Sequence, residues 1–277
     1  MMSVPCIRGY RSMLSLVFRW KLPEISLSPV LRDLIRSFSI QRPVARVSPP
    51  SWDLNLVLKA LIAPPFEPLG EASFRNLTKK TLFLLSLATA RRVGEVQALS
   101  ARVAQLGGDM SLSYLPGFVA KTESQDNPIP RSFLLKSLKD FVGDLEEERL
   151  LCPVRALSCY LKMTESLSPR SPNLFVSPRC RQRAISKNAI SFFLRETISG
   201  AGALRVDEGQ PLRAHSIRGV STSVAFHRNW SVKQVLKAAT WKSNSVFASF
   251  YLKDVSYVWD DCRSLGPFVA AGQIISA

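Results

Sequence analysis

The chain has 277 residues, of which 46% are hydrophobic, so it can bury one large core or two small ones and is not disordered along its length. Its formal net charge of +16 at pH 7 favours polyanionic partners, nucleic acid first and an anionic membrane second. A basic surface that serves solubility alone is the ordinary alternative, and charge does not separate a protein that reads DNA from one that cuts or coats it.

The first fifty residues divide into a helical part and a connection. Residues 7–40 are predicted to form two or three short helices, broken at Pro23 and Pro29. Residues 41–50 hold three prolines and show no apolar period, a composition typical of a linker. We therefore place a domain boundary at this linker, with the main domain at residues 51–277.

Apolar side chains at helical spacing predict a series of helices in the main domain. The predicted helices cover about residues 53–62, 74–88, 92–99, 153–163, 186–200, 214–228, 231–240 and 245–254. Asp53 and Ser186 are expected to cap the helices that they precede, and Pro153 suits a first helical turn. Ser231 and Gln234 have the spacing of a capping box.

Residues 110–135 change to a β-rich pattern that is broken by turn residues. The three candidate strands are residues 110–115, 118–122 and 130–135. Gly107 and Gly108 end the helical run before them, and residues 173–177 are expected to be a short strand or extended piece. The predicted fold class is mainly α, with a small antiparallel β-sheet that lies against helices.

Composition argues against several classes of protein. The five cysteines are scattered and form no CxxC pair, so we expect neither a disulfide framework nor a zinc site, and we expect a reducing compartment. The longest apolar run, residues 82–90, is too short to cross a bilayer. Residues 1–23 lack acidic side chains and superficially resemble an organellar transit peptide, but no secretory signal is present.

Two groups of residues near the C-terminus could carry chemistry. His215 and Arg218 are three apart and so share a face of a helix. Attack on a phosphodiester needs cations at the non-bridging oxygens and proton transfer at both ends, which suits such a pair. A solvated basic helix face is the ordinary alternative, and Trp241 and Tyr251 taken singly would be core aromatics.

A second set lies earlier in the chain. Arg92 and Glu95 have the spacing of a helical ion pair, which would be worth a few tenths of a kcal/mol. Arg91 precedes them directly. Lys121 follows a β-rich stretch near a hairpin turn, where a lysine is ordinarily solvated.

Taken in order, these residues resemble the tyrosine recombinases, the phage-integrase family. The matching segments are TARRVGEVQAL (89–99), FVAKTESQDNPIP (118–130), HSIRG (215–219) and TWKSNSVFASFYL (240–252). Phrases such as LCPVRAL and LGPFVAAGQII most resemble the recombinases of DIRS-type retrotransposons and related eukaryotic elements. The resemblance spans residues 50–277 and implies the tyrosine recombinase catalytic-domain fold.

The resemblance implies a nucleophile and two phosphate-binding arginines. Tyr251 would attack the scissile phosphate and form a 3′-phosphotyrosyl link that conserves the bond for rejoining. Arg92 and Arg218 would hold the non-bridging oxygens in bidentate fashion. Whether Arg91 or Arg92 faces the phosphate depends on the alignment, and Arg92 is favoured.

The resemblance also implies the groups that move protons. Lys121 would protonate the leaving 5′ oxygen, His215 would manage the proton of the tyrosine, and Trp241 would pack and hydrogen-bond beside the phosphate. It implies no metal and no cofactor.

In the family, a full helical core-binding domain precedes the catalytic domain. Residues 1–40 are therefore expected to be a truncated remnant of this SAM-like DNA-binding domain, before the linker at 41–50. The tail at 255–277 would dock on a neighbouring subunit or pack in cis. The implied partner is double-stranded DNA, bound by a homotetramer on two duplexes in the nucleus, with no membrane.

The sequence thus leads to a site-specific DNA recombinase encoded by a mobile element. A catalytically inactive DNA-binding remnant of such an element is the second hypothesis. A basic helical scaffold that binds acidic partners is the third hypothesis. It does not explain why the matching residues occur in the same order as in the tyrosine recombinases.

Overall fold

The structure is a computed structural model, and it divides into two compact units, Met1–Arg46 and Val47–Ala277. The residues that it describes are 4–18, 28–41, 51–121, 123, 125, 128–139, 149–204, 212–227 and 231–239.

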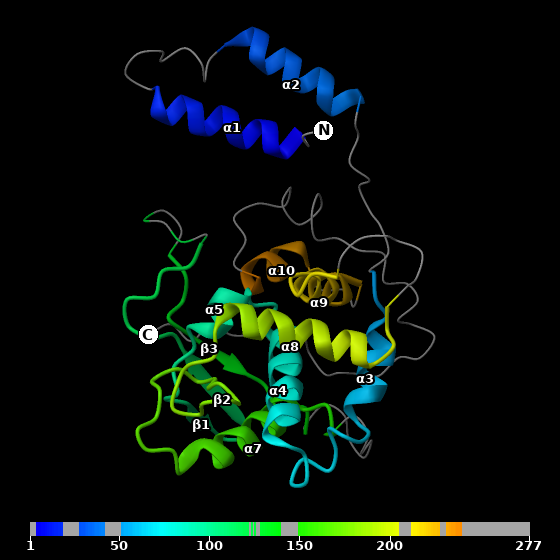
Figure 1. Ribbon diagram of the computed structural model, residues 1–277, viewed down its shortest axis with the longest axis vertical. Helices are drawn as coiled ribbons and strands as arrows, with labels where there is room; N and C mark the ends of the chain where they lie inside the picture. Colours follow the sequence, from blue (N-terminus) through cyan, green and yellow to red (C-terminus); the bar gives the residue numbers. More distant parts are fainter. Residues whose placement is uncertain are drawn as a thin grey trace. The chain divides into compact units, whose positions relative to one another are not determined.

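The first unit contains two helices, α1 (Val4–Val17) and α2 (Pro29–Gln41), which pack against each other (Figure 1). Both fall where short helices were predicted, although α1 begins before residue 7. Pro29 does not break a helix but begins one, because its fixed φ suits the first turn and its missing N–H has no partner there.

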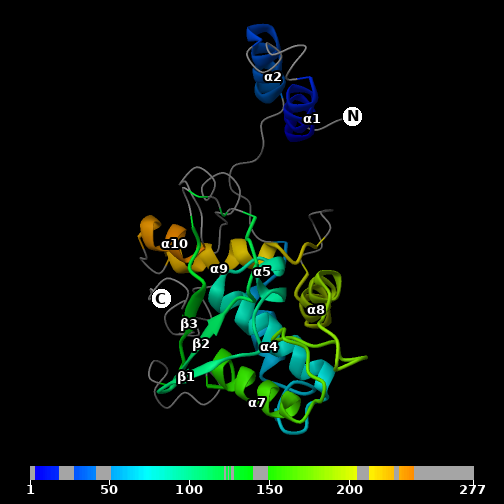
Figure 2. The ribbon, with the colours of Figure 1, turned by 90° about the vertical axis from the view of Figure 1, so that its left-hand side faces the viewer.

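The second unit is built around one central helix. Its described helices are α3 (Leu54–Leu61), α4 (Phe74–Thr89), α5 (Val93–Gln97), α7 (Pro153–Glu165), α8 (Lys187–Gly200), α9 (Ser216–His227) and α10 (Val232–Ala238). Helices α7, α8 and α9 all pack on α4 (Figures 1 and 2). No helix in the described ranges is both long and apolar enough to span a bilayer.

The predicted helix caps are confirmed. The Asp53 carboxylate accepts from the N–H groups of Asn55 and Leu56, at 2.8 and 3.3 Å. Ser186 Oγ accepts from the N–H of Ala189 at 3.1 Å. The capping box before α10 joins Gln234 Oε1 to the N–H of Ser231 at 2.9 Å, with the return bond at 3.2 Å.

The small sheet has three antiparallel strands in the order β1-β2-β3, and only part of it was predicted correctly. The strands are β1 (Ala104–Leu106), β2 (Asp109–Ser113) and β3 (Ser132–Leu135). Gly107, with a φ of 64°, forms the turn between β1 and β2 rather than only ending a helical run. The prediction of a strand at residues 118–122 was wrong, because Phe118–Ala120 are irregular and Lys121 lies in a turn.

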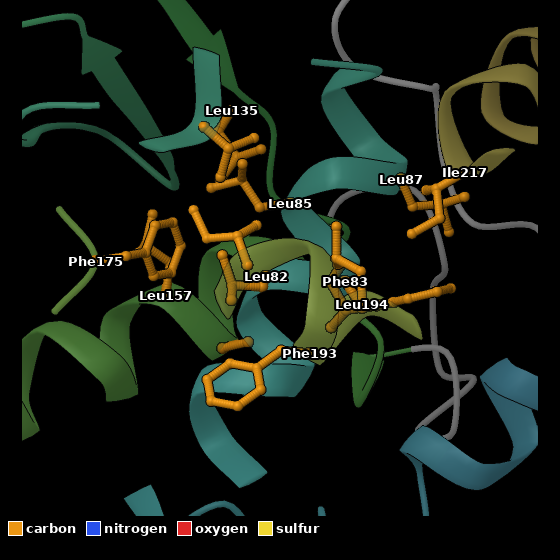
Figure 3. Packing of buried hydrophobic residues seen from close by; sticks show 14 of the residues in the cluster. Leu82, Phe83, Leu85, Leu87, Leu135, Leu157, Phe175, Phe193, Leu194 and Ile217 are labelled. Atoms are coloured by element: carbon orange, nitrogen blue, oxygen red, sulfur yellow. The ribbon is translucent and has the colours of Figure 1, made fainter. Parts of the chain in front are cut away.

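The core surrounds α4. Leu82, Phe83 and Leu85 are completely or almost completely buried there, and Figure 3 shows them among side chains from α7, α8, α9 and β3. Trp52 is also fully buried, and its indole N–H donates to Ser216 Oγ at 2.8 Å. This bond ties the chain before α3 to the first residue of α9.

One buried charge cluster lies among the segments that support α4. Lys80 is fully buried, donates to the carbonyl of Leu61 at 2.7 Å and pairs with the carboxylate of Glu67. Glu67 also receives two hydrogen bonds from Arg155 on α7, at 2.6 and 3.1 Å. A buried ammonium needs such partners, because an unpaired charge in the interior is costly.

Candidate active site

The junction between α4 and α5 turns the chain sharply just before two consecutive arginines. Ala90 ends α4 with a φ of 48°, the left-handed conformation that residues with a Cβ seldom adopt. This conformation costs about 1 kcal/mol in an alanine. Strained backbone of this kind gathers at functional sites, where the surrounding structure enforces it.

Arg91 and Arg92 point to different places. The Arg91 side chain is 5% exposed, and its guanidinium carbon lies 4.5 Å from the centre of the Phe133 ring. Within the described part of the chain, its Nε and Nη1 atoms have no hydrogen-bond partner. Arg92 instead lines an open pocket. The geometry therefore favours Arg92 as the arginine that faces a ligand.

Glu95 on α5 connects two arginines from distant parts of the sequence. Its carboxylate accepts from Arg92 Nη1 at 2.9 Å and from the backbone N–H of Arg92 at 3.2 Å. The oxygen that accepts from this backbone N–H, Oε2, also lies 3.9 Å from Nη1 of Arg218 on α9. Because Glu95 and Arg218 are both almost fully buried, the carboxylate compensates charge that water does not reach.

Arg218 is further fixed by the end of α10. Its Nη2 donates to the carbonyl oxygen of Ala239, and its own backbone N–H donates to the carbonyl of His215 at 3.2 Å. The predicted proximity of His215 and Arg218 is thus present, although His215 stands in the turn before α9 rather than within the helix.

His215 lines the pocket and is exposed to solvent. The protein around the ring lowers the pKa of His215 below its ordinary value of 6.5, with partial loss of hydration as the largest cause. The positive charges of Arg218, Arg92, Lys121 and Arg213 lower it further, in that order. The imidazole is therefore neutral near pH 7 and able to accept a proton.

Lys121 reaches the same pocket from the connection between β2 and β3. Glu123 holds this turn, since its carboxylate accepts from the N–H of Ala120 at 3.0 Å and pairs with the guanidinium of Arg131. Arg131 also donates to the carbonyl of Phe118 at 2.8 Å. These contacts flank the lysine on both sides.

The pocket has a volume of about 710 Å³ and a strongly cationic lining. Arg92, Lys121 and His215 line it, as predicted site residues, together with Arg195 of α8 and Arg213. The sequence did not single out the last two. Arg213 lies two residues before His215 and could have been noticed there, whereas nothing in the sequence marked Arg195.

Two predicted site residues, Trp241 and Tyr251, lie outside the described residues. Among the residues that are described, no three side chains of histidine, cysteine, aspartate or glutamate gather as metal ligands would.

Comparison with known proteins gives a likeness in structure only. No protein-family model matches the chain, and no curated protein matches it by sequence. The XerH site-specific recombinase bound to palindromic difH substrate, in a post-cleavage complex, superposes with a TM-score of 0.53 and 12% identity, over 95% of this chain and 70% of that one. XerA recombinase gives a TM-score of 0.49 and 15% identity, over 95% and 85%. A lambda integrase dimer bound to a COC′ core site gives 0.45 and 15%, over 95% and 67%.

The XerH likeness extends over 95% of this chain, in which helices pack around α4 beside a three-stranded antiparallel sheet. The chain therefore has the mainly helical fold, with a small antiparallel sheet, of the tyrosine recombinase catalytic domain.

Proposed function

We propose that the chain is a site-specific DNA recombinase that cuts and rejoins DNA through a 3′-phosphotyrosyl intermediate. The observation that carries the proposal is the cationic pocket, in which Arg92, Lys121 and His215 meet while Glu95 joins Arg92 to the buried Arg218. A phosphodiester in transfer carries its negative charge on oxygens, and fixed guanidinium groups stabilise that charge most in a site with little water.

The reaction needs a nucleophile and two proton transfers. The phenol oxygen of Tyr251 forms a bond to phosphorus as the bond to the 5′ oxygen breaks, and the phosphate remains ester-linked throughout. Neutral His215 takes the phenol proton, and the ammonium of Lys121 gives a proton to the departing 5′ oxygen. Attack by the freed 5′ hydroxyl of another strand reverses these steps and releases the tyrosine.

The two arginines have different tasks in this scheme. Arg92, which lines the pocket, contacts the non-bridging oxygens, while Arg218 supplies charge from a buried position. Trp241 packs beside the phosphate.

The wider assignment is also a proposal. The structure of XerH bound to its palindromic difH substrate after cleavage supports double-stranded DNA as the partner of a chain with the same fold. The sequence phrases that resemble DIRS-type recombinases support a mobile-element origin and action in the nucleus. Assembly as a homotetramer on two duplexes, with residues 255–277 docked on a neighbour, completes this assignment.

A suicide duplex tests the proposal. A nick placed just beyond the scissile phosphate makes the fragment with the freed 5′ hydroxyl so short that it diffuses away. The covalent protein–DNA complex then accumulates and is seen on a denaturing gel. The wild-type chain should form this complex in the presence of a chelator, and Tyr251→Phe should not. Identical gels for the two proteins would contradict the mechanism, and DNA binding without any complex would make the chain an inactive DNA-binding remnant.

A further inference from the structure

A second cavity lies against α8, the helix that also borders the candidate active site. It has a volume of about 440 Å³ and is lined by Asn188, Phe192 and Phe193 from α8, by Arg75 from α4 and by Arg179 from the loop before α8. The same helix contributes Ser191 and Arg195 to the cationic pocket. One helix therefore borders both cavities.

The exposed edge of α8 carries an aromatic ring between polar groups. Asn188, Phe192 and Arg195 follow one another at helical spacing along the solvent side of the helix. Phe192 is 49% exposed, and its ring centre lies 6.0 Å from that of the buried Phe193. The guanidinium of Arg75 lies 6.0 Å from the centre of the Phe192 ring. The Phe192 ring thus packs against the protein on one side and remains exposed enough to stack with a flat ligand.

The charge around this ring favours an anion. Glu196, the acidic residue of α8, is already paired with Arg75 at 2.8 Å and with Lys79 at 3.0 Å. Within the described part of the chain, Arg179 and Arg195 make no ion pair with any acidic side chain. The surface therefore presents a cation, an aromatic face and a second cation in succession, which matches a phosphate, a base and the next phosphate of an unpaired strand.

We propose that α8 binds a single-stranded DNA segment that leaves the candidate active site, with an unpaired base stacked on Phe192 and the adjacent phosphates on Arg195 and Arg179. A duplex keeps its bases stacked on one another, so only an unpaired strand can use the ring. The origin of that strand rests on the proposed function, because strand cleavage releases a 5′ end beside α8. Binding itself requires no cleavage.

Fluorescence anisotropy with a labelled single-stranded oligonucleotide of mixed sequence tests this surface in the full chain. Phe192→Ala should weaken binding by about fivefold to 150-fold, the range for loss of one stacked base, whereas Phe192→Tyr should bind within about twofold of wild type. Leu56→Ala is the matched control, since Leu56 is an exposed apolar side chain on α3. Binding of an intact duplex should be the same in all four proteins.

The salt dependence separates the ring from the arginines. Arg179→Ala should reduce the slope of log affinity against log salt by about 0.7, the value for one lost phosphate contact on a single strand. Phe192→Ala should leave that slope unchanged. A 5-iododeoxyuridine in the strand should crosslink on irradiation within the tryptic peptide at residues 188–195, at Phe192.

Several results would overturn the inference. The first is that wild type binds no single strand, and the second is that Phe192→Ala binds the single strand with unchanged affinity. The third is that Phe192→Ala loses as much affinity for duplex as for the single strand. The fourth is that an acidic peptide binds at Phe192 while the single strand does not. The proposed function fails separately. Covalent capture with unchanged single-strand binding in Phe192→Ala refutes only the α8 surface, while Phe192-dependent binding without covalent capture refutes only the recombinase activity.

Discussion

At the scale of single residues, the site depends on how three charges balance. Glu95 is buried between Arg92 and Arg218, and it supplies the carboxylate that the described structure places nearest to both. It orients Arg92 and allows Arg218 to remain charged without water. The residue therefore acts through the arginines and has no direct role in proton transfer.

Glu95→Gln tests this balance, because the substitution keeps the shape of the side chain and removes its charge. Leaving buried guanidinium groups uncompensated should cost about 3 kcal/mol of unfolding free energy, measured by urea denaturation. Glu196→Gln is the matched control. It removes the charge that pairs with Arg75 and Lys79 at the more exposed Glu196 of α8, and it should cost less than about 1 kcal/mol. Equal losses of unfolding free energy in the two variants would show that the charge of Glu95 contributes no more to stability than the charge of the exposed Glu196.

The pKa of His215 gives a second prediction at this scale. Proton NMR should show His215 titrating below 6.5, because partial burial and four neighbouring cations oppose its charged form. Arg92→Ala should raise this pKa, and so should bound duplex, whose phosphate favours the imidazolium. With only two histidines, the signals can be assigned from His227→Asn. A pKa that neither change moves would contradict the proximity of these groups.

The same shift has a consequence for stability. The folded-state pKa of His215 lies below that of the unfolded chain, so the unfolded chain takes up the proton first as pH falls. The folded protein should therefore lose stability as pH falls below about 6.5 and show no contribution from this residue above it.

Much of the site could be predicted from the order of residues along the chain. Arg92, Lys121 and His215 were named from the sequence and share one pocket in the structure. The second partner of Glu95 could not be predicted, because the contact to Arg218 depends on tertiary packing between α5 and α9. Arg195 was missed for the same reason, since an exposed arginine on a helix carries no local signal.

At the scale of elements, α8 is the helix that links the two cavities. Periodicity and capping predicted α3, α4, α7 and α8 because each buries one apolar stripe. The strand β1 was missed because all three of its residues are exposed and show no alternation. The stretch at residues 118–122 has strand composition, but the contacts of Glu123 and Arg131 hold it as a turn.

The cap of α8 can be tested directly. Ser186→Ala removes the acceptor of the Ala189 N–H and should lower the unfolding free energy by about 1 kcal/mol, measured by urea denaturation. Ser186→Asp should keep most of the stability, because aspartate also caps. Ser199→Ala, at the exposed end of the same helix, is the control. If it costs as much as Ser186→Ala, the cap contributes nothing.

At the scale of the whole molecule, part of the excess positive charge lies around the candidate active site. The net charge of +16 predicted a polyanionic partner but no site. The fold gathers five cationic or titratable side chains around one pocket, and Glu95, which pairs with Arg92, is not among the residues that line it. The likeness to XerH in fold extends over 95% of this chain.

The most direct test of the account is to map the protein–DNA bond itself. After covalent capture on the suicide duplex, nuclease and trypsin digestion should leave a nucleotide attached through a 3′-phosphate to the peptide at residues 243–253. Tandem mass spectrometry should then locate the nucleotide on Tyr251, the tyrosine of that peptide. An adduct on a serine, or on any peptide other than this one, would contradict the account.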